Sequence, residues 1–282
     1  MIGKYKEKIM QVVFLLTACV SIAAVVLICV YLLGNGIPTI FKIGLSNFFG
    51  TVWKPSKNLF GIVPMIVGSI YVTAGAILIG VPIGLLCAIY LSRFCPKGIY
   101  RILKPAVELM AGIPSIVYGF FGLMVIVPVI QNLTGTSGKS LLTASILLGI
   151  MILPTIISVA ESSLNAVPNS YYEGSLALGA THERSVFSAV LPAAKSGVMS
   201  GVILGVGRAI GETMAVIMIA GNQAIMPSGL LKGLRTMTAN IVLEMGYASG
   251  LHREALIATG VVLFVFILII NTCFSLLKRR NG

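Results

Sequence analysis

Six stretches of this chain are each long and apolar enough to cross a lipid bilayer as a helix. A membrane helix needs about 20 mostly apolar residues. The predicted spans cover residues 10–33, 62–91, 106–130, 141–160, 200–220 and 255–277. Only 10% of the 282 residues are charged, whereas a soluble domain carries about 25% and needs them to cover a water-facing surface. The sequence therefore predicts an all-α membrane protein with six transmembrane helices.

Lys and Arg residues are distributed unequally between the two sides of the predicted membrane. Twelve lie before the first span, after the second and fourth spans and at the C-terminus, whereas seven lie in the other loops. Cytoplasmic loops are enriched in these residues, so both termini are predicted to be cytoplasmic. The first span is too long for the core of a signal peptide, and we expect it to be retained.

The spans divide the chain into three predicted parts. Residues 1–61 comprise the first transmembrane helix and an external loop, residues 62–277 form the remaining membrane core, and residues 278–282 form a basic cytoplasmic tail. Within the core, residues 161–199 make a long inner loop and residues 221–254 a long outer loop. Loops of this length are usually functional or disordered. No internal repeat is evident, which argues against a secondary transporter built from two inverted halves.

The composition argues against binding of nucleic acid or metal. The net charge is +12, but no basic stretch is interleaved with the aromatic residues that a nucleic-acid platform requires. The five cysteines form no CxxC pair, and the only histidines, His182 and His252, are far apart in the sequence. We therefore expect the lipid bilayer as a partner, and neither nucleic acid nor a metal site.

The inner loop contains two short amphipathic helical patterns separated by Gly179. The first begins as a capping box, in which Ser170 caps the helix and Glu173 reaches back to its start. Thr181 is predicted to cap the second helix. The apolar side chains expected on one face of this second helix are Val186, Phe187 and Val190. The pattern is consistent with a capped helical hairpin, and equally with a ridge that docks into a partner's groove.

The same hairpin resembles a loop shared by the membrane subunits of ABC importers. In that family the loop reads E-A-A, three residues, Gly, nine residues, Ile, one residue, Leu-Pro. The matching stretch here comprises Glu173, Gly174 and Ser175, then Gly179 with Ala180 after it, and finally Leu191 and Pro192. Gly174, Ser175 and Ala189 depart from the family pattern, more in size than in character.

The resemblance carries expectations for fold and partners. It implies the type I ABC importer transmembrane fold, in which this loop is the coupling helix that docks onto a cytoplasmic ATPase dimer. ATP and Mg would then bind to the partner ATPase, and this chain would hold no cofactor. Residues 134–140, TGTSGKS, superficially suggest a phosphate-binding loop, but Leu133 stands where its first glycine is required and no strand precedes it. We therefore expect a non-catalytic transport subunit.

Arg208 and Glu212 lie at the centre of the fifth predicted span, in the sequence GRAIGETMAV. A charge at mid-membrane costs about 2.5–3.5 kcal/mol on insertion scales and usually faces a bundle interior or a watery cavity. Because the two residues are four positions apart, they are expected to share a helix face and to be able to pair. Gly201 and Gly205 extend this stripe and allow another helix to approach closely. A second row of small residues consists of Gly207 and Gly211.

Two interpretations of the charged pair remain open. It could be a structural ion pair that locks two helices together. Alternatively, the planar guanidinium of Arg208 could bind phosphate oxygens, while Glu212 orients it and keeps binding weak enough for release. Glu212 could also accept a hydrogen bond from a protonated phosphate oxygen, which a fully ionised sulfate lacks. Thr213 supplies the neighbouring hydroxyl.

GRAIGETMAV further resembles the fifth-helix signature of the phosphate-specific ABC permease pair. Its Met-Ala-Val ending is similar to the PstC-type subunit, whereas the PstA-type subunit continues with Ala-Pro after Gly-Glu-Thr. Residues 108–122 and 249–252 also resemble the PstC type. The resemblance implies a permease in a bacterial or archaeal inner membrane that pairs with a PstA-like subunit. It would receive inorganic phosphate from an extracytoplasmic binding protein and pass it along Arg208, Glu212 and Thr213.

Two residues near the start of the third span, Glu108 and Ser115, are weaker pathway candidates. Glu108 could line the pathway, but an ion pair with Lys104 at i−4 is the favoured structural account. Pro114 with Ser115 predicts a kink or opening in the helix, and Tyr118 could simply be a packing residue.

Two other functions are weighed against phosphate import. One is a permease for another oxyanion, such as molybdate, sulfate or phosphonate, which the chemistry of an Arg–Glu pair alone would allow. The other is an intramembrane enzyme that acts on lipid phosphates. Such an enzyme needs a nucleophile or a metal cluster near Arg208, and the fifth span offers only Thr213.

Overall fold

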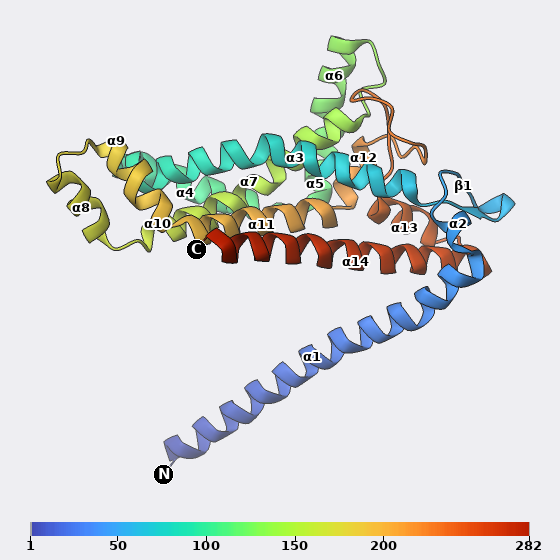
Figure 1. The fold of residues 1–282 in the computed structure, drawn as a ribbon, viewed down its shortest axis with the longest axis horizontal. Coiled ribbons are helices and arrows are strands. Elements are labelled where there is room, and N and C mark those ends of the chain that lie inside the picture. Colours follow the sequence, from blue (N-terminus) through green and yellow to red (C-terminus); the bar gives the residue numbers. More distant parts are fainter. Residues whose placement is uncertain (1, 282) are drawn as a thin grey trace.

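The computed structural model describes residues 2–281, with the side chains of residues 7–273, 275 and 276. Most of the chain is helical (Figure 1). The longer helices are α1 (Ile2–Ile43), α3 (Val63–Ile89), α4 (Lys97–Gly112), α7 (Leu141–Asn165), α11 (Lys195–Gly211) and α14 (Gly250–Asn281). The shorter helices are α2 (Leu45–Phe48), α5 (Ser115–Phe121), α6 (Val127–Thr134), α8 (Asn169–Ala177), α9 (His182–Ser185), α10 (Leu191–Ala193), α12 (Met214–Ile219) and α13 (Met237–Met245). The side chains of the predicted basic tail, residues 278–282, lie outside the described residues.

By length and composition, several helices of the described chain can cross a membrane. Five stretches qualify on their own: Glu7–Ile43, Val63–Phe94, Ser115–Thr134, Leu141–Asn165 and Gly250–Cys273. A sixth is reached if His182–Ala193 and Lys195–Gly211, two helices bent by 72°, are counted as one span. The prediction of an all-α membrane protein is confirmed, and the six predicted spans are reached when this bent pair is counted as one span.

The predicted start of the third span, at residue 106, is wrong. Residues up to Gly112 belong to α4, an amphipathic helix on which no residue is buried. The backbone is extended at Ile113 and Pro114, and the apolar stretch begins at Ser115. The predicted opening at Pro114 is confirmed, because a proline disfavours helical backbone in the residue before it.

Helices α3, α7, α11 and α14 run side by side through the body of the molecule (Figure 1). Helix α7 lies at its centre and carries fully or nearly fully buried side chains, among them Leu147, Met151 and Ile156. Helices α3 and α7 approach each other closely at small residues. A Cβ added to Gly80 would lie 2.8 Å from the Gly149 carbonyl oxygen of α7. The two backbones are therefore in contact there, as small residues allow in membrane bundles.

Helix α1 is longer than the first predicted span and contacts the body only near its C-terminal end. It continues through Pro38 to Ile43, so the first external loop starts later than residue 34. Near this end Gly36 packs on α14, where a Cβ would meet Val261 and Ala258. Towards the N-terminus α1 diverges from the other helices (Figure 1), and every described side chain of residues 7–28 is exposed.

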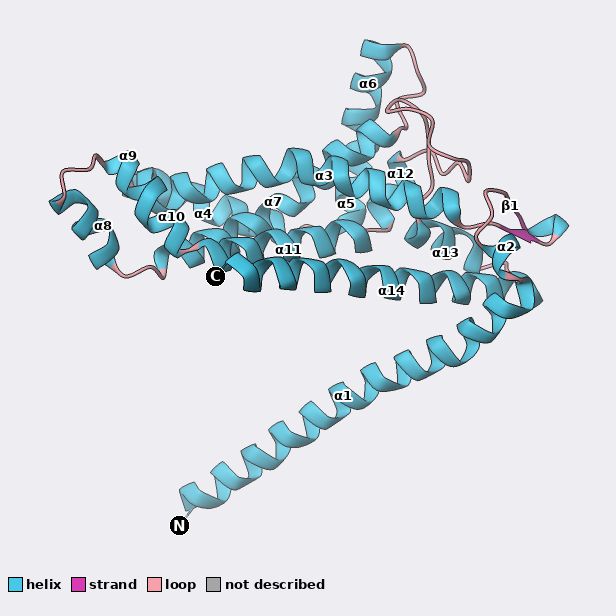
Figure 2. Ribbon diagram, viewed as in Figure 1, coloured by secondary structure: helices cyan, strands magenta, loops and turns pink. Residues whose placement is uncertain are grey.

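The two ends of the bundle carry different structures. We call the end with α8, α9 and α10 the loop end, and the opposite end, with α2, α13 and the strands, the strand end (Figure 1). The strands, coloured in Figure 2, are β1 (Trp53–Lys54) and β2 (Leu59–Phe60), and they pair antiparallel. The aromatic side chains of Phe48, Trp53 and Phe60 are buried there against α3, α13 and α14. This packing fixes the segment between α1 and α3 to the body.

The contact between α3 and α7 yields a stability prediction. We expect Gly80→Ala to destabilise the protein by about 1–3 kcal/mol, because the added methyl meets a backbone carbonyl that cannot move aside. Gly34→Ala in α1 is the matched control, since a Cβ there has nothing within 4 Å and alanine favours a helix. Thermal unfolding of the purified variants in detergent measures both effects; equal melting temperatures would contradict the contact.

Candidate functional site

The fifth predicted span is interrupted at its charged centre. Helix α11 ends at Gly211, Glu212 is extended with φ −68° and ψ 131°, and α12 begins only at Met214. The prediction that Arg208 and Glu212 share one face of a continuous helix is therefore wrong. Among the described residues they form no ion pair with each other.

The Glu212 carboxylate instead caps the following helix. Its Oε1 atom accepts hydrogen bonds from the backbone N–H groups of Thr213 at 3.1 Å and Ala215 at 3.2 Å. The first N–H groups of a helix have no partner within it, and an acidic side chain at that end is favoured by the helix dipole. The Thr213 hydroxyl donates to the Gly211 carbonyl at 3.2 Å. The polar groups of the break are thus largely satisfied by the residues of the break itself.

The Arg208 side chain has no hydrogen-bond or ion-pair partner among the described residues. It is half-buried. Next to it, Gly207 and Gly211 face open space, since a Cβ at either position has nothing within 4 Å. The Arg208 side chain is therefore partly buried and unpaired, next to glycines that face open space.

The two rows of glycines in α11 have different surroundings. Gly201 and Gly205 pack against α7, where a Cβ would meet Val159 at 3.2 Å and Ile156 at 2.8 Å respectively. The predicted close helix approach at these two glycines is confirmed. The row of Gly207 and Gly211 lies on the open face beside Arg208.

The extended junction between α4 and α5, directly before the third span, lies close to the break in the fifth. Gly119 of α5 packs on α12, where a Cβ would lie 2.9 Å from the Cα atom of Ala215. The Tyr118 hydroxyl donates a 2.8 Å hydrogen bond to the Met110 carbonyl of α4, across the gap between α4 and α5. Tyr118 is therefore more than a packing residue. Ser115 is half-buried at the start of α5, and its hydroxyl makes no hydrogen bond with a described residue.

Glu108 is placed as the structural account predicted. Its side chain is 60% exposed and lies 3.7 Å from the Lys104 ammonium. Lys104 has a closer partner that the sequence analysis missed, the buried Glu161 of α7, at 2.7 Å. Tyr100 also donates to Glu161, at 2.7 Å. This cluster ties α4 to the end of α7 near the loop end; an acid in the last turns of an apolar span was the signal that could have revealed it.

The electrostatics of this cluster agree with its geometry. The hydrogen bond to Glu161 raises the pKa of Tyr100, so the phenol stays neutral and donates. Burial opposes the charge of Lys104, but the hydrogen bond to Glu161 and the charge of that carboxylate outweigh it, and the pKa of Lys104 is raised. Lys104 and Glu161 therefore form a charged pair.

The predicted coupling loop is a helical hairpin, but its first helix does not begin as predicted. Helix α8 follows Pro168, and no side chain caps it, so the capping box of Ser170 and Glu173 is wrong. Thr181 caps α9 as predicted, by accepting from the Arg184 N–H at 3.4 Å. Gly179 between the helices has φ +84°, a left-handed conformation that favours glycine.

The second half of the hairpin is anchored and the first half is exposed. Val186 and Val190 are buried against the ends of α3 and α7, but Phe187 is exposed, contrary to the prediction of one common face. A π-helical turn over Val186–Val190 shifts the side-chain register there. His182 joins the halves through a 2.8 Å hydrogen bond with the Tyr172 hydroxyl. At the tip, Leu178 is 91% exposed.

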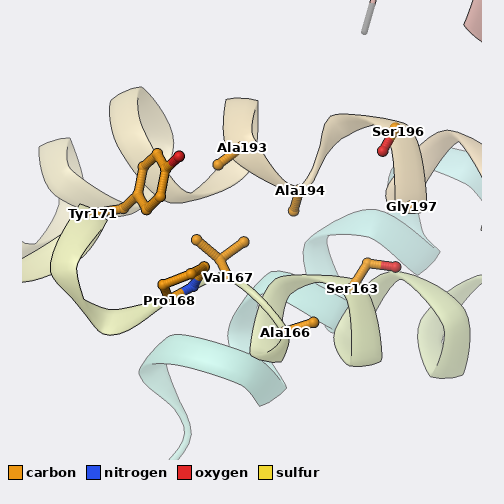
Figure 3. Close-up of a pocket in the computed structure, with 9 residues that line it drawn as sticks. All are labelled: Ser163, Ala166, Val167, Pro168, Tyr171, Ala193, Ala194, Ser196 and Gly197. Atoms are coloured by element: carbon orange, nitrogen blue, oxygen red, sulfur yellow. The ribbon is translucent and has the colours of Figure 1, made fainter. Parts of the chain in front are cut away.

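A recess of about 350 Å³ lies where the hairpin meets the bundle (Figure 3). Tyr171 of α8 lies at one end of it, Ser163 of α7 and Ser196 of α11 line the other, and Pro168 with Val167 forms its floor. The start of α8 is thus separated from the start of α11 by open space.

A second buried acid, Glu244 of α13, holds the strand end together, and the sequence did not reveal this role. Its Oε1 atom pairs with the Arg235 guanidinium at 2.6 Å, and its Oε2 atom accepts from the Trp53 indole at 2.9 Å and lies 2.8 Å from His252 Nε2. The cluster joins the β-hairpin, α13 and α14. The residues of this cluster are widely spaced in the sequence, so no local sequence pattern predicts it.

Comparisons with known proteins identify relatives over most of the chain. The family model for binding-protein-dependent transport system inner membrane components matches residues 80–281. A probable ABC transporter permease of Bacillus subtilis, YqgH, is 38% identical over 271 residues, which are 91% of this chain and 88% of that protein. The phosphate transport system permease protein PstC of Xylella fastidiosa is 35% identical and covers 95% of this chain and 91% of its own length.

Solved structures show the same fold at low sequence identity. The MetNI methionine ABC transporter in an inward-facing conformation has a TM-score of 0.63 at 20% identity and covers 82% of this chain and 100% of its own. A bacterial alginate ABC transporter has a TM-score of 0.64 at 14% identity and covers 94% of both chains. The fold predicted from the resemblance to ABC importer membrane subunits is confirmed.

The buried pair of Glu161 and Lys104 yields a second stability prediction. We expect Glu161→Ala to destabilise the protein by about 3 kcal/mol, because it leaves Lys104 partly buried without its closest partner. Glu254→Ala is the matched control. It breaks an equally short ion pair with Lys42, but one whose partners are 42% and 59% exposed, and such pairs contribute about 0–1 kcal/mol. Thermal unfolding distinguishes the two, and a similar small effect of both variants would refute a stabilising role for Glu161.

Proposed function

We propose that this chain forms half of the membrane pathway of an ATP-driven importer of inorganic phosphate. The chain belongs to the family of binding-protein-dependent transport system inner membrane components. One observation carries this proposal. Arg208 presents an unpaired, half-buried guanidinium beside the break in the fifth span, close to the junction between α4 and α5. Relatives that are 35% identical are named as phosphate transport system permeases, which identifies the anion that we propose for this site.

The chemistry of the site is appropriate to a passing phosphate ion. A guanidinium keeps its charge and offers donors in a planar fork that matches phosphate oxygens. Glu212 uses Oε1 to cap α12, while its Oε2 accepts no hydrogen bond from a described residue. That oxygen can accept from a protonated phosphate and repels a fully ionised sulfate. The nearby negative charge also limits affinity, as release from a pathway requires.

The partners that we propose follow from the two ends and the open face of the molecule. The open face of α11 at Gly207 and Gly211 would face a PstA-like permease, so that two chains enclose the pathway. The hairpin between α7 and α11, with Leu178 at its tip, would dock onto a cytoplasmic ATPase dimer that binds ATP and Mg. Both termini would then be cytoplasmic, and the strand end would meet the extracytoplasmic phosphate-binding protein.

The role of Arg208 is tested by charge removal. We expect Arg208→Gln to lower phosphate uptake about 10- to 100-fold, since hydrogen bonds to a charged group contribute about 1.5–3 kcal/mol. Subunit assembly should be unaffected, because no described residue pairs with Arg208. Radiolabelled phosphate uptake and co-purification of the subunits measure the two quantities. Arg253→Gln, at an exposed position of α14, is the control.

Two outcomes would count against phosphate passage at Arg208. Normal uptake by the Arg208→Gln variant would remove the residue from the pathway. Uptake of molybdate, sulfate or phosphonate at a higher rate than phosphate by the unmodified importer would replace phosphate by another oxyanion.

ATPase docking through the hairpin is tested at Gly179. We expect Gly179→Ala to weaken association with the ATPase several-fold, because φ +84° strains any residue with a Cβ by about 1–2 kcal/mol. Glu173→Ala should also weaken it, because it removes an exposed carboxylate from the proposed docking surface. Gly98→Ala is the control, since Gly98 lies at the same end with open space around it and ordinary backbone angles. Co-purification of unchanged amounts of ATPase with the first two variants would exclude docking at this hairpin.

A further inference from the structure

The break at Glu212 receives one hydrogen bond from a distant part of the chain. The Thr238 hydroxyl of α13 donates to the Glu212 carbonyl oxygen at 3.1 Å, across 26 positions of sequence. In a continuous helix that carbonyl would accept from an N–H group four residues later. Thr238 therefore takes the place of the helical hydrogen bond that the break removes, and among the described residues it is the one partner of this carbonyl.

The hydrogen bond to the Glu212 carbonyl fixes the direction of a second one, between Thr236 and Thr238. Thr238 and Thr236 are both buried, and their hydroxyls lie 3.0 Å apart. Because the single proton of the Thr238 hydroxyl goes to Glu212, the Thr236 hydroxyl must donate to Thr238. Thr236 in turn accepts from the Ala239 N–H at 3.2 Å. The three groups form a directed chain that starts at the N-terminus of α13 and ends at the break.

The segment that carries Thr238 is held firmly on three sides. The Met237 N–H donates to the Ser69 hydroxyl of α3 at 3.0 Å, and the Leu234 N–H donates to the Ala220 carbonyl after α12 at 2.8 Å. The ion pair between Arg235 and Glu244 connects the segment to the cluster at the strand end. Both Leu234 and Met237 are fully buried. The Thr238 hydroxyl is thus presented to Glu212 from a rigid support.

The position of Glu212 decides whether Arg208 is paired. If α11 continued as a helix through Glu212, the two side chains would stand at i and i+4, where opposite charges attract. In the observed conformation the carboxylate is occupied with the N–H groups of α12 instead. We propose that Thr238 is a positioning residue, whose hydroxyl holds the break at Glu212 and so keeps Arg208 unpaired and available to the passing anion. This proposal rests on the proposed passage of phosphate at Arg208.

The functional test compares three threonine variants in the complete importer, reconstituted in liposomes with its ATPase and binding protein. Thr238→Val keeps the shape of the side chain but removes the hydroxyl. We expect it to lower the phosphate moved per ATP hydrolysed about 2- to 10-fold, the range for the loss of one hydrogen bond. Thr238→Ser keeps a hydroxyl, and its ratio should be close to that of the unmodified importer. Thr259→Val, the matched control, removes a buried hydroxyl that donates only to Ala255 within α14, and it should leave the ratio unchanged.

A double variant tests the mechanism. Glu212→Gln retains an oxygen that can cap α12 but cannot form an ion pair with Arg208. In this background Thr238→Val should lower the ratio little further, because no pairing remains to be prevented. A decrease by the same factor in both backgrounds would overturn the proposed mechanism. So would an unchanged ratio in Thr238→Val alone, or equal losses in Thr238→Val and Thr259→Val.

A structural readout separates this proposal from the proposed function. Gly211→Cys places a thiol in open space at the end of α11, in a background without the five native cysteines. We expect Thr238→Val to change its reaction rate with a water-soluble thiol reagent several-fold, and Thr259→Val not to change it. An unchanged rate in Thr238→Val would refute positioning by Thr238, even if Arg208→Gln abolishes uptake. A changed rate together with normal uptake by Arg208→Gln would refute phosphate passage at Arg208 alone.

Discussion

Lipid provides no hydrogen-bond partner for the backbone, so each interruption of a membrane helix must be satisfied by the protein itself. Two extended segments lie side by side in this structure, the junction between α4 and α5 at the start of the third span and the break at Glu212. At the first, the Tyr118 hydroxyl donates to the Met110 carbonyl. At the second, the Glu212 carboxylate accepts from the start of α12, and Thr238 donates to the Glu212 carbonyl. These side chains make non-helical backbone tolerable inside the bundle, and open backbone at this depth is expected only where it lines a cavity or an interface.

The same constraint distinguishes structural charges from functional ones. Glu161 and Glu244 are buried acids, and each has a cation and at least one further donor within 3 Å. A buried charge without such partners would strongly destabilise the fold, so these clusters are explained by the stability of the two ends of the bundle. Arg208 is the contrasting case, because no described residue pairs with it. We explain this unpaired cation by transient binding of the anion that we propose for the pathway.

The sequence predicted the features that depend on local chemistry. Apolar runs gave the spans, Pro114 gave the opening of the third one, and Thr181 gave a helix cap. The errors arose where tertiary contacts override local preference. Glu212 fits a helical pattern, but Thr238 and the start of α12 stabilise an extended backbone there. Glu161 and its partner Lys104 come from different helices, so only the folded structure brings them together.

Helix α11 joins the two regions to which we assign function. It begins at the 72° bend after the hairpin and ends at Gly211, directly before the break. Its 17 residues make a helix about 25 Å long, and Gly201 and Gly205 fit it closely against α7. The points at which the backbone can bend therefore lie at its ends, and not along its length. A displacement of the hairpin would be carried along α11 as a rigid body to Arg208, and the break at Glu212 is where the chain would yield.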